Sequence, residues 1–246
     1  MIARFYLDSS FEEPLILSGD EFHHLAHVLR IRVGEEVELV NGRGSLARVQ
    51  VKRLTKEAVE FSLINSTHEP RSSPLLFLGL SLIRINRLEW TIEKGTELGA
   101  DGFVLFPAEH SEQKGISHHQ LSRLSHLTLS ALKQCGRLYL PEIIYVSSLS
   151  EVLARDALFL FGDLDDEEAE PIFSTFSSAK PIIFLTGPEG GFSPQEIEKL
   201  RKKKARGVQL HKNILRAETA PLAALYALYL RLNPERSGWR QNSPSH

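Results

Sequence analysis

The chain has 246 residues, of which 42% are hydrophobic, so it holds enough apolar surface for one large domain or two moderate ones. Its single cysteine, Cys135, excludes an intramolecular disulfide framework and a cysteine-based zinc site, as is typical of a reducing compartment. No apolar run approaches the length of a membrane span and the N-terminus has no long apolar core, which predicts a soluble cytoplasmic protein.

The net charge of −2 argues against a general affinity for polyanions, but the charge is unevenly spread. Residues 201–246 carry ten Lys or Arg and two acidic residues, whereas residues 1–200 carry nineteen and twenty-nine. The basic run Arg201–Lys204 lies at a predicted helix end, where it would offset the helix dipole, and this explanation suffices for the run alone. A local patch that holds a polyanion is the alternative.

Residues 1–66 alternate apolar and polar positions in short runs, a pattern typical of strands. The turn Asn41–Gly44 predicts a hairpin between two of these runs. We therefore predict a small β-rich barrel or sandwich with one helical piece, followed by a polar linker over 67–74 that contains two prolines. The strands are expected over 2–7, 15–17, 36–40, 45–52 and 58–64, and the helical piece over 20–29.

From Leu75 onward, apolar strand-like runs alternate with helical patterns. This order predicts an α/β domain over 75–233, with a mostly parallel sheet covered on both faces, and a tail over 234–246. The acidic stretch 163–170 is expected to be a loop. Strands are expected over 75–82, 103–106, 143–146, 157–161, 181–185 and 208–210, and helices over 87–98, 121–134, 149–154, from 194 onward and over 216–232.

A glycine-rich loop follows the strand predicted over 181–185. Ser193 is expected to cap the next helix, with Pro194 at its first position and Glu196 completing a capping box. Three glycines then lie in the turn between strand and helix, where they permit positive φ or a close approach of the backbone to a ligand. A plain tight turn is the alternative. The glycines are Gly187, Gly190 and Gly191.

Ligands of open α/β sheets lie beyond the carboxyl ends of the strands, where this loop and the turn Leu210–Arg216 are both expected. The glycine spacing is not that of a dinucleotide fingerprint, and no Lys-Ser or Lys-Thr follows as in a phosphate loop. Glu189 would also repel a pyrophosphate. A ligand with an adenosine but no phosphate, such as S-adenosylmethionine with its cationic sulfonium, avoids that repulsion.

Five motifs in order resemble those of the ribosomal RNA small subunit methyltransferase E family, which belongs to the SPOUT class. The resemblance covers essentially the whole chain except the tail. It rests on Gly187-Pro-Glu-Gly-Gly-Phe-Ser193, Ile214-Leu-Arg-Ala-Glu-Thr-Ala220, Glu93-Lys-Gly-Thr-Glu-Leu-Gly99, Gln134-Cys-Gly-Arg137 with Pro141-Glu-Ile143, and the N-terminal set Arg4-Phe5, His23-His24-Leu25, Val28-Leu29-Arg30 and Gly34.

The resemblance implies a PUA-like RNA-binding β-barrel over 1–66 and a SPOUT domain over 75–233 whose C-terminal segment forms a trefoil knot. Two chains would pair as a homodimer to make the site. The implied reaction is methylation of N3 of one uridine in 16S ribosomal RNA of the small ribosomal subunit, with S-adenosylmethionine as donor. The implied cofactor-binding residues are Leu185, Thr186, Gly187, Glu189, Gly190, Gly191, Leu210, Ile214, Leu215, Glu218 and Thr219. Capping of the last helix would also explain Glu218 and Thr219. Glu189 is expected to hold a backbone amide, with proton acceptor as its alternative role.

Methylation of uridine N3 leaves negative charge on the base carbonyls once the proton departs, and a guanidinium stabilises that charge well. The candidate catalytic residues are therefore Arg4 and Arg216, with a β-edge charge and a loop anchor as their alternative roles. No metal is indicated, because His118 and His119 are adjacent and are expected to face solvent near a helix start. The residues expected to face RNA are His23, His24, Arg30 and Arg137, although His23 and Leu25 are equally open to a packing role.

Some positions depart from the family pattern. His211 and Asn213 replace a glycine and an arginine, Lys133 replaces a glutamate, and Gln113 stands near a usual arginine. If the glycine had positive φ, His211 would be strained. His211 thus favours the alternative of a non-catalytic RNA-binding or ribosome-assembly factor.

Two further alternatives are a transfer RNA methyltransferase, which the N-terminal barrel disfavours, and a nucleotide-dependent enzyme, which the loop spacing opposes. The last helix is apolar on more than one face, so it is either wrapped by its own domain or paired with a second chain. The residues that carry this expectation are Leu222, Leu225, Tyr226, Leu228, Tyr229 and Leu232.

Overall fold

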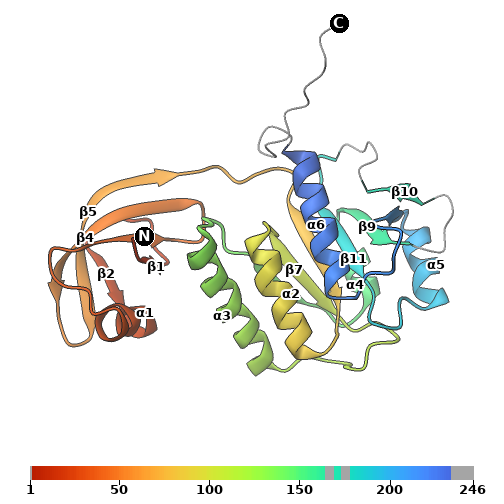
Figure 1. Ribbon diagram of the computed structural model, residues 1–246, viewed down its shortest axis with the longest axis horizontal. Coiled ribbons are helices and arrows are strands. Elements are labelled where there is room, and N and C mark those ends of the chain that lie inside the picture. Colours follow the sequence, from red (N-terminus) through yellow and green to blue (C-terminus); the bar gives the residue numbers. More distant parts are fainter. Residues whose placement is uncertain (1, 164–168, 173–177, 234–246) are drawn as a thin grey trace, which may run out of the picture. The chain divides into compact units, whose positions relative to one another are not determined.

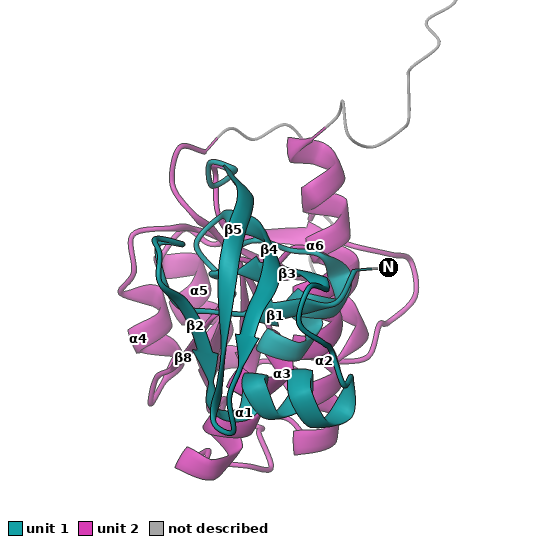
Figure 2. Cartoon of the chain, turned by 90° about the vertical axis from the view of Figure 1, so that its left-hand side faces the viewer, with its two compact units in different colours: residues 1–72, 129–140 teal, residues 73–128, 141–246 magenta. Residues whose placement is uncertain are grey.

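The computed structural model describes residues 2–163, 169–172 and 178–233. They belong to two compact units, which Figure 2 colours separately. Unit 1 comprises Met1–Ser72 together with Leu129–Leu140, and unit 2 comprises Ser73–Thr128 and Pro141–His246. Within the described ranges, no helix has the length and apolar content that a membrane crossing needs.

Unit 1 is built on a five-stranded sheet in the order β1-β3-β4-β5-β2, in which β1 pairs with β3 in parallel and the other pairs are antiparallel. Alternate residues of the strands are buried, as the period-two pattern predicts. The helical piece is a short α1 (Gly19–His23) that continues as a π-helical turn (His24–Val28). The strands are β1 (Arg4–Tyr6), β2 (Leu15–Ser18), β3 (Glu36–Val40), β4 (Ser45–Leu54) and β5 (Ala58–His68).

The strand β5 extends to His68, so the linker predicted from residue 67 begins inside a strand. The polar composition of this stretch is overridden by its antiparallel partner, because Ser45 pairs with His68 and Leu46 with Thr67. The composition of this stretch mispredicts where β5 ends, because the end of a strand depends on the neighbouring strand as well as on its own residues.

A segment distant in sequence completes unit 1. The helix α3 (His118–Cys135) ends within this unit, and the chain after it bonds to the hairpin turn. The Leu140 amide donates to the Gly42 carbonyl at 2.9 Å, and the Gly44 amide donates to the Leu138 carbonyl at 2.9 Å. Gly44 has φ of +93° and a Cβ there would collide with the Tyr139 side chain. The predicted hairpin is therefore present, but its turn is shaped by residues 138–140.

Unit 2 is built on a seven-stranded sheet in which every pair is parallel, in the order β10-β12-β9-β11-β6-β7-β8. This confirms the predicted α/β class. The short strand β10 (Glu170–Pro171) begins at the last residue of the predicted acidic loop 163–170, of which residues 164–168 are outside the described part. The other strands are β6 (Leu76–Ser81), β7 (Gly102–Phe106), β8 (Glu142–Tyr145), β9 (Leu158–Gly162), β11 (Ile182–Thr186) and β12 (Arg206–Gln209).

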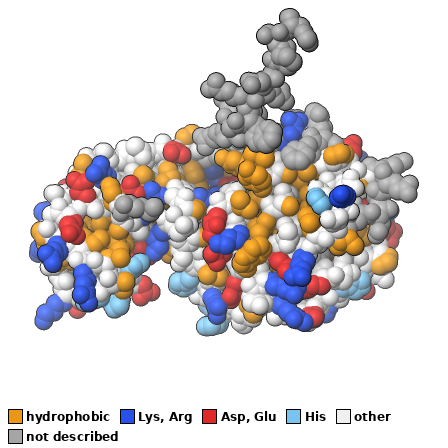
Figure 3. Space-filling model, viewed as in Figure 1, with side chains coloured by type: hydrophobic (Ala, Val, Ile, Leu, Met, Phe, Trp, Pro, Cys, Tyr) orange, Lys and Arg blue, Asp and Glu red, His pale blue; other side chains and the backbone are white. Residues whose placement is uncertain are grey.

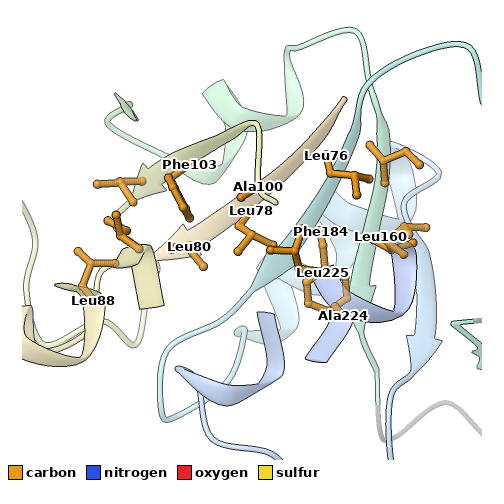
Figure 4. Close-up of a cluster of buried hydrophobic side chains, with 14 of the residues drawn as sticks. Leu76, Leu78, Leu80, Leu88, Ala100, Phe103, Leu160, Phe184, Ala224 and Leu225 are labelled. Atoms are coloured by element: carbon orange, nitrogen blue, oxygen red, sulfur yellow. The ribbon is translucent and has the colours of Figure 1, made fainter. Parts of the chain in front are cut away.

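Both faces of this sheet are buried, which explains why its central strands are continuously apolar. On one face, which α2 (Ile85–Glu97) and α6 (Thr219–Leu232) cover (Figure 1), Phe184 packs in a cluster with residues of both helices, as Figure 4 shows. On the other face, Leu185 packs with α4 (Leu149–Leu153) and α5 (Pro194–Lys202). The side chains of neighbouring β11 residues thus pack against helices on opposite faces of the sheet.

The chain crosses over near the centre of the sheet. β11 lies between β9 and β6, the next strand β12 lies beyond β9, and α6 then returns to the face that covers β11 and β6. This return carries residues 210–218 past the carboxyl edge of the sheet. The small sheet of unit 1 and the all-parallel sheet of unit 2 agree with the predicted order of a β-rich unit followed by an α/β unit.

Candidate active site

A cavity of about 710 Å³ lies in unit 2 at the carboxyl ends of β9, β11 and β12. One wall is the glycine loop, Thr186–Gly191, and the opposite wall is the turn Leu210–Arg216. Gly162 and Asp163, at the end of β9, complete the lining between them. The two segments expected to enclose a ligand therefore do face one cavity.

The glycine loop is tightly fixed. The Gly191 amide donates to the Pro188 carbonyl at 2.8 Å, and Gly191 has φ of +70°. His110, on the loop after β7, places Nδ1 3.2 Å from the carbonyl oxygens of both Gly190 and Gly191, so this nitrogen carries the proton and donates. A Cβ at Gly187 would lie 3.0 Å from the Phe192 nitrogen, which explains why only glycine fits there.

The predicted capping box anchors the end of this loop. The Ser193 hydroxyl accepts from the Glu196 amide at 3.2 Å, and the Glu196 carboxylate accepts from the Ser193 amide at 3.0 Å. The other Glu196 oxygen accepts from the Glu109 amide at 3.0 Å, beside His110. One buried carboxylate thus joins the start of α5 to the loop after β7, and both support the cavity wall.

Arg87 links the glycine loop to the start of α6 through ion pairs. Its guanidinium lies 3.0 Å from Glu189 of the glycine loop and 3.8 Å from Glu218 at the start of α6. Arg216, which lines the cavity, lies 4.0 Å from the same Glu218. Figure 3 shows cationic and acidic side chains gathered on this part of the surface. The Glu189 carboxylate is therefore held by a cation.

Sequence reasoning missed Arg87, although one signal was available. Arg87 lies in the first turn of α2, which holds no acidic residue. A cation is unfavourable at this end of the helix dipole, so its presence there indicates an acidic partner elsewhere in the fold. His110 was missed because no local pattern connects it with a loop 80 residues later.

The turn Leu210–Arg216 shows how the departure at His211 is accommodated. The non-glycine residues with positive φ in the described ranges are Phe11, Arg30 and Lys204, so the His211 backbone is unstrained. The His211 ring accepts a hydrogen bond from the Asn213 amide at 3.0 Å. Replacement of a glycine at this position therefore costs no backbone strain, and the main observation in favour of a non-catalytic factor falls away.

Two buried oxygens beside the cavity have no hydrogen-bond partner within the described part of the chain. They are Oγ1 of Thr186, which lines the cavity, and Oε2 of Glu218. Buried polar atoms are nearly always satisfied, so an orphaned oxygen in a cavity wall indicates a position for a ligand or water.

Most of the residues expected to bind the cofactor line this cavity. Glu218 and Thr219 are not part of the lining. Glu218 occupies the N-cap position of α6 without a side-chain capping bond, and Thr219 is exposed. The predicted residues that do line the cavity are Leu185, Thr186, Gly187, Glu189, Gly190, Gly191, Leu210, Ile214, Leu215 and Arg216.

Comparison with known proteins identifies the family. An RNA methyltransferase domain matches residues 71–229, and an RNA methyltransferase PUA domain matches residues 17–64. The ribosomal RNA small subunit methyltransferase E of Bacillus subtilis is 30% identical over 225 residues, which are 86% of this chain and 88% of that protein. The chain belongs to the ribosomal RNA small subunit methyltransferase E family. The enzyme of this name from Mycobacterium tuberculosis is 30% identical over 237 residues and is covered over 90% of its length.

Solved structures of the family share the fold. The ribosomal RNA small subunit methyltransferase E of Neisseria gonorrhoeae, a crystal structure with bound S-adenosyl methionine, matches with a TM-score of 0.84 and 28% identity, over 93% of this chain and 97% of that one. A predicted RNA methyltransferase from Thermotoga maritima matches with a TM-score of 0.73 and 26% identity, over 95% and 99%.

The second candidate catalytic residue, Arg4, lies in unit 1 on β1. Its Nε and Nη2 donate to one oxygen of Glu38, on the adjacent strand β3, at 3.0 and 2.7 Å. Its Nη1 is buried without a hydrogen-bond partner among the described residues. The side chain is thus partly engaged in a cross-strand pair, and one donor is left over.

The four residues expected to face RNA all lie in unit 1. His23 and His24 are exposed, and the His23 ring lies 4.9 Å from the ring of His27, between centroids. Arg30 is exposed with φ of +54°, and Arg137 is half-buried in the segment after α3. Leu25, by contrast, is fully buried, so the packing role applies to Leu25 and not to His23.

Two remaining sequence features are also placed. Lys133, which departs from the family pattern, forms an ion pair with Glu21 inside unit 1. His118 and His119 are exposed at the start of α3, as expected. In the residues that the structure describes, no three or more His, Cys, Asp or Glu side chains are arranged to hold a metal ion.

Proposed function

We propose that this protein transfers the methyl group of S-adenosylmethionine to N3 of one uridine in 16S ribosomal RNA of the small ribosomal subunit. The observation that carries the proposal is the cavity between the glycine loop and the Leu210–Arg216 turn, in a chain of this family. The cavity volume is in the range of small-molecule and cofactor sites.

The chemistry of the lining fits this cofactor. The lining holds the carboxylates of Asp163 and Glu189 and the guanidinium groups of Arg87 and Arg216, and S-adenosylmethionine likewise carries charges of both signs. The orphaned Oγ1 of Thr186 is available to a polar group of the ligand. Leu185, Leu210 and Ile214 supply apolar surface against which an adenine can lie. S-adenosylmethionine, when bound, supplies an electrophilic methyl group.

Arg216 is the residue to which we assign stabilisation of the uracil anion. Its side chain is 79% exposed at the cavity rim, so the guanidinium is accessible to a base that enters from solvent. Glu218, 4.0 Å away, keeps the guanidinium near the rim. Negative charge that develops on the uracil carbonyls would accept hydrogen bonds from it. Arg4 is the second candidate, through the donor that Glu38 leaves free.

The cofactor is tested by titration calorimetry with S-adenosylmethionine. We expect binding, and the absence of measurable heat would overturn the proposal. The substrate is tested by mapping modified uridines in 16S ribosomal RNA of a deletion strain. Loss of one N3-methyluridine, restored by adding the protein to the isolated small subunits, is expected; an unchanged set of modifications would refute the assignment.

The role of Arg216 gives a sharper variant. R216Q should retain S-adenosylmethionine binding but lower methyl transfer by about 10²- to 10³-fold, as loss of a donor to a developing oxyanion does. The matched control is K212Q, which removes an exposed cation from the same turn. Equal activity of R216Q and K212Q would remove Arg216 from the mechanism.

We also propose that the protein works as a homodimer in the cytoplasm. Most of the apolar surface of α6 packs on its own sheet, but Tyr226 remains 51% exposed and Trp90 of α2 44% exposed. Figure 3 shows hydrophobic side chains gathered over α2 and α6. Exposed aromatic residues on one face suit an interface between copies. Light scattering should give the mass of a dimer at micromolar concentration, and a monomer mass would contradict this proposal.

A further inference from the structure

Six cationic side chains of unit 2 lie close together in the chain and outside the cavity. All six are exposed. They lie on the last turn of α5 and on the chain that leads into β12, and none lines the cavity. We call this surface the basic strip. It consists of Lys199, Arg201, Lys202, Lys203, Lys204 and Arg206.

Within the described ranges, acidic side chains form ion pairs with two of the six cations of the strip. Lys202 pairs with Glu198 at 2.7 Å, and Arg201 lies 3.8 Å from Asp163. No acidic group in the described ranges forms an ion pair with Lys203, Lys204 or the other two members. The helix dipole also does not account for them, because its effect is limited to the last turn, which already holds three cations.

Lys204 provides an independent observation, because its backbone is strained. It has φ of +59°, in the left-handed region that glycine occupies at helix ends. The Ala205 amide donates to the Leu200 carbonyl at 3.0 Å and closes the helix in the usual way. A non-glycine residue there costs about 1 kcal/mol. The chain thus has a cation at a position where glycine would be more stable, and such exceptions are concentrated at functional positions.

We propose that the basic strip binds the phosphate backbone of ribosomal RNA, as a contact surface of unit 2 separate from the cavity. The inference rests on the proposed function for the identity of the RNA. The strip contains cations but no aromatic residue, so it is suited to phosphates and not to stacked or edge-read bases. A binding site of this kind positions an RNA without reading its sequence.

The location of the strip fits RNA that extends beyond the target nucleotide. α5 begins beside the glycine loop and ends at the strip, and its nine residues span about 13 Å. β12 likewise runs from the strip, at Arg206, to the cavity wall at Leu210. A single nucleotide in the cavity would not reach the strip, whereas a folded RNA would contact both.

The test compares two triple variants of the full chain that remove the same charge. The strip variant is K203Q/K204G/R206Q, and the control is R84Q/R123Q/K180Q, which removes three exposed cations of unit 2 that pair with Glu112, Glu89 and Asp156. Affinity for a 16S ribosomal RNA transcript is measured against salt concentration. The slope of log affinity against log salt should fall by about two to three in the strip variant only.

Further measurements distinguish the RNA site from the proposed methyltransferase function. K204G alone should weaken RNA binding without lowering the melting temperature, because glycine relieves the strained backbone. S-adenosylmethionine affinity should be unchanged in the strip variant. If the strip variant binds the transcript with the same slope of log affinity against log salt as the parental chain, the strip is not an RNA site. This conclusion holds even if the parental chain methylates its uridine. If the parental chain methylates no uridine but the slope still falls, the proposed function is wrong and the strip stands as an RNA site.

Discussion

The glycine loop is fixed by contacts from three other elements. The turn Leu210–Arg216, on the opposite side of the cavity, has a hydrogen bond within the turn. His110, Glu196 and Arg87 bond to the glycine loop or to its ends. Within Leu210–Leu215, the structure gives one hydrogen bond, from the Asn213 amide to the His211 ring. Ile214, in the middle of the turn, is 85% exposed.

The first wall is thus held by contacts with other elements, whereas the second wall is held mainly by the course of its own chain. A wall fixed by the buried Glu196 carboxylate and by close backbone packing at Gly187 cannot adapt at low cost. A turn with few bonds and an exposed apolar side chain has low local stability and can adjust to what it covers. Substitutions in the first wall should therefore have larger effects than those in the second.

The largest effect is expected for G187A. A Cβ at Gly187 would press on backbone atoms of Gly191 and Phe192, which cannot rotate away. Overpacking of this kind costs about 1 to 3 kcal/mol, so S-adenosylmethionine affinity should fall roughly 5- to 150-fold in calorimetry. The matched variant is G191A, where a Cβ meets nothing within 4 Å and only the φ of +70° is unfavourable. A smaller loss in G187A than in G191A would mean that the loop is not rigid.

The next effect is expected for R87Q. It leaves Glu189 and the 12% exposed side chain of Glu218 without the cation between them. We expect a loss of about 1 to 2 kcal/mol in the free energy of unfolding, measured with denaturant, and weaker cofactor binding. R84Q is the control, since Arg84 precedes the same helix but pairs at 3.5 Å with the exposed Glu112. Equal stability of the two variants would contradict the linking role of Arg87.

A third, smaller effect is expected for H110A. The carbonyls of Gly190 and Gly191 lose their shared donor, and a hydrogen bond of this kind contributes about 1 kcal/mol. S-adenosylmethionine affinity should fall about fivefold. H110N, which keeps a side-chain donor, should recover part of the loss. If H110A binds the cofactor as the parent does, the first wall owes its rigidity to the capping box and Arg87.

The smallest effect is expected for H211G, in the second wall. His211 has no positive φ for glycine to relieve, and the change removes one exposed hydrogen bond, so cofactor affinity should change by no more than about twofold. A marked gain in affinity would show that the turn is strained by His211 after all. The comparison of the two walls would then need to be reversed.

Local patterns in the sequence were sufficient for much of the fold. The capping box at Ser193 is recognisable because its partners lie three residues apart, and the parallel sheet is recognisable because both of its faces are apolar. The cavity-lining loops could also be located, since ligands in such sheets lie at the carboxyl ends of the strands.

What sequence reasoning missed depends on partners far along the chain. Arg87 meets Glu189 across 102 positions, and His110 meets Gly190 across 80. The short β10 forms only because β12 lies beside it. None of these pairings leaves a periodic signal, so a single sequence gives no means of finding them, apart from the misplaced cation at the start of α2.

Unit 1 also depends on Leu129–Leu140, which are synthesised after the first part of unit 2. Its hairpin turn receives hydrogen bonds from residues 138–140, and the polar pair of Glu21 and Lys133 closes its helical side. During synthesis, a chain of 72 residues already holds all five strands but lacks this segment. Unit 1 therefore acquires its last backbone hydrogen bonds only after more than half of the chain has been synthesised, once part of unit 2 has been made.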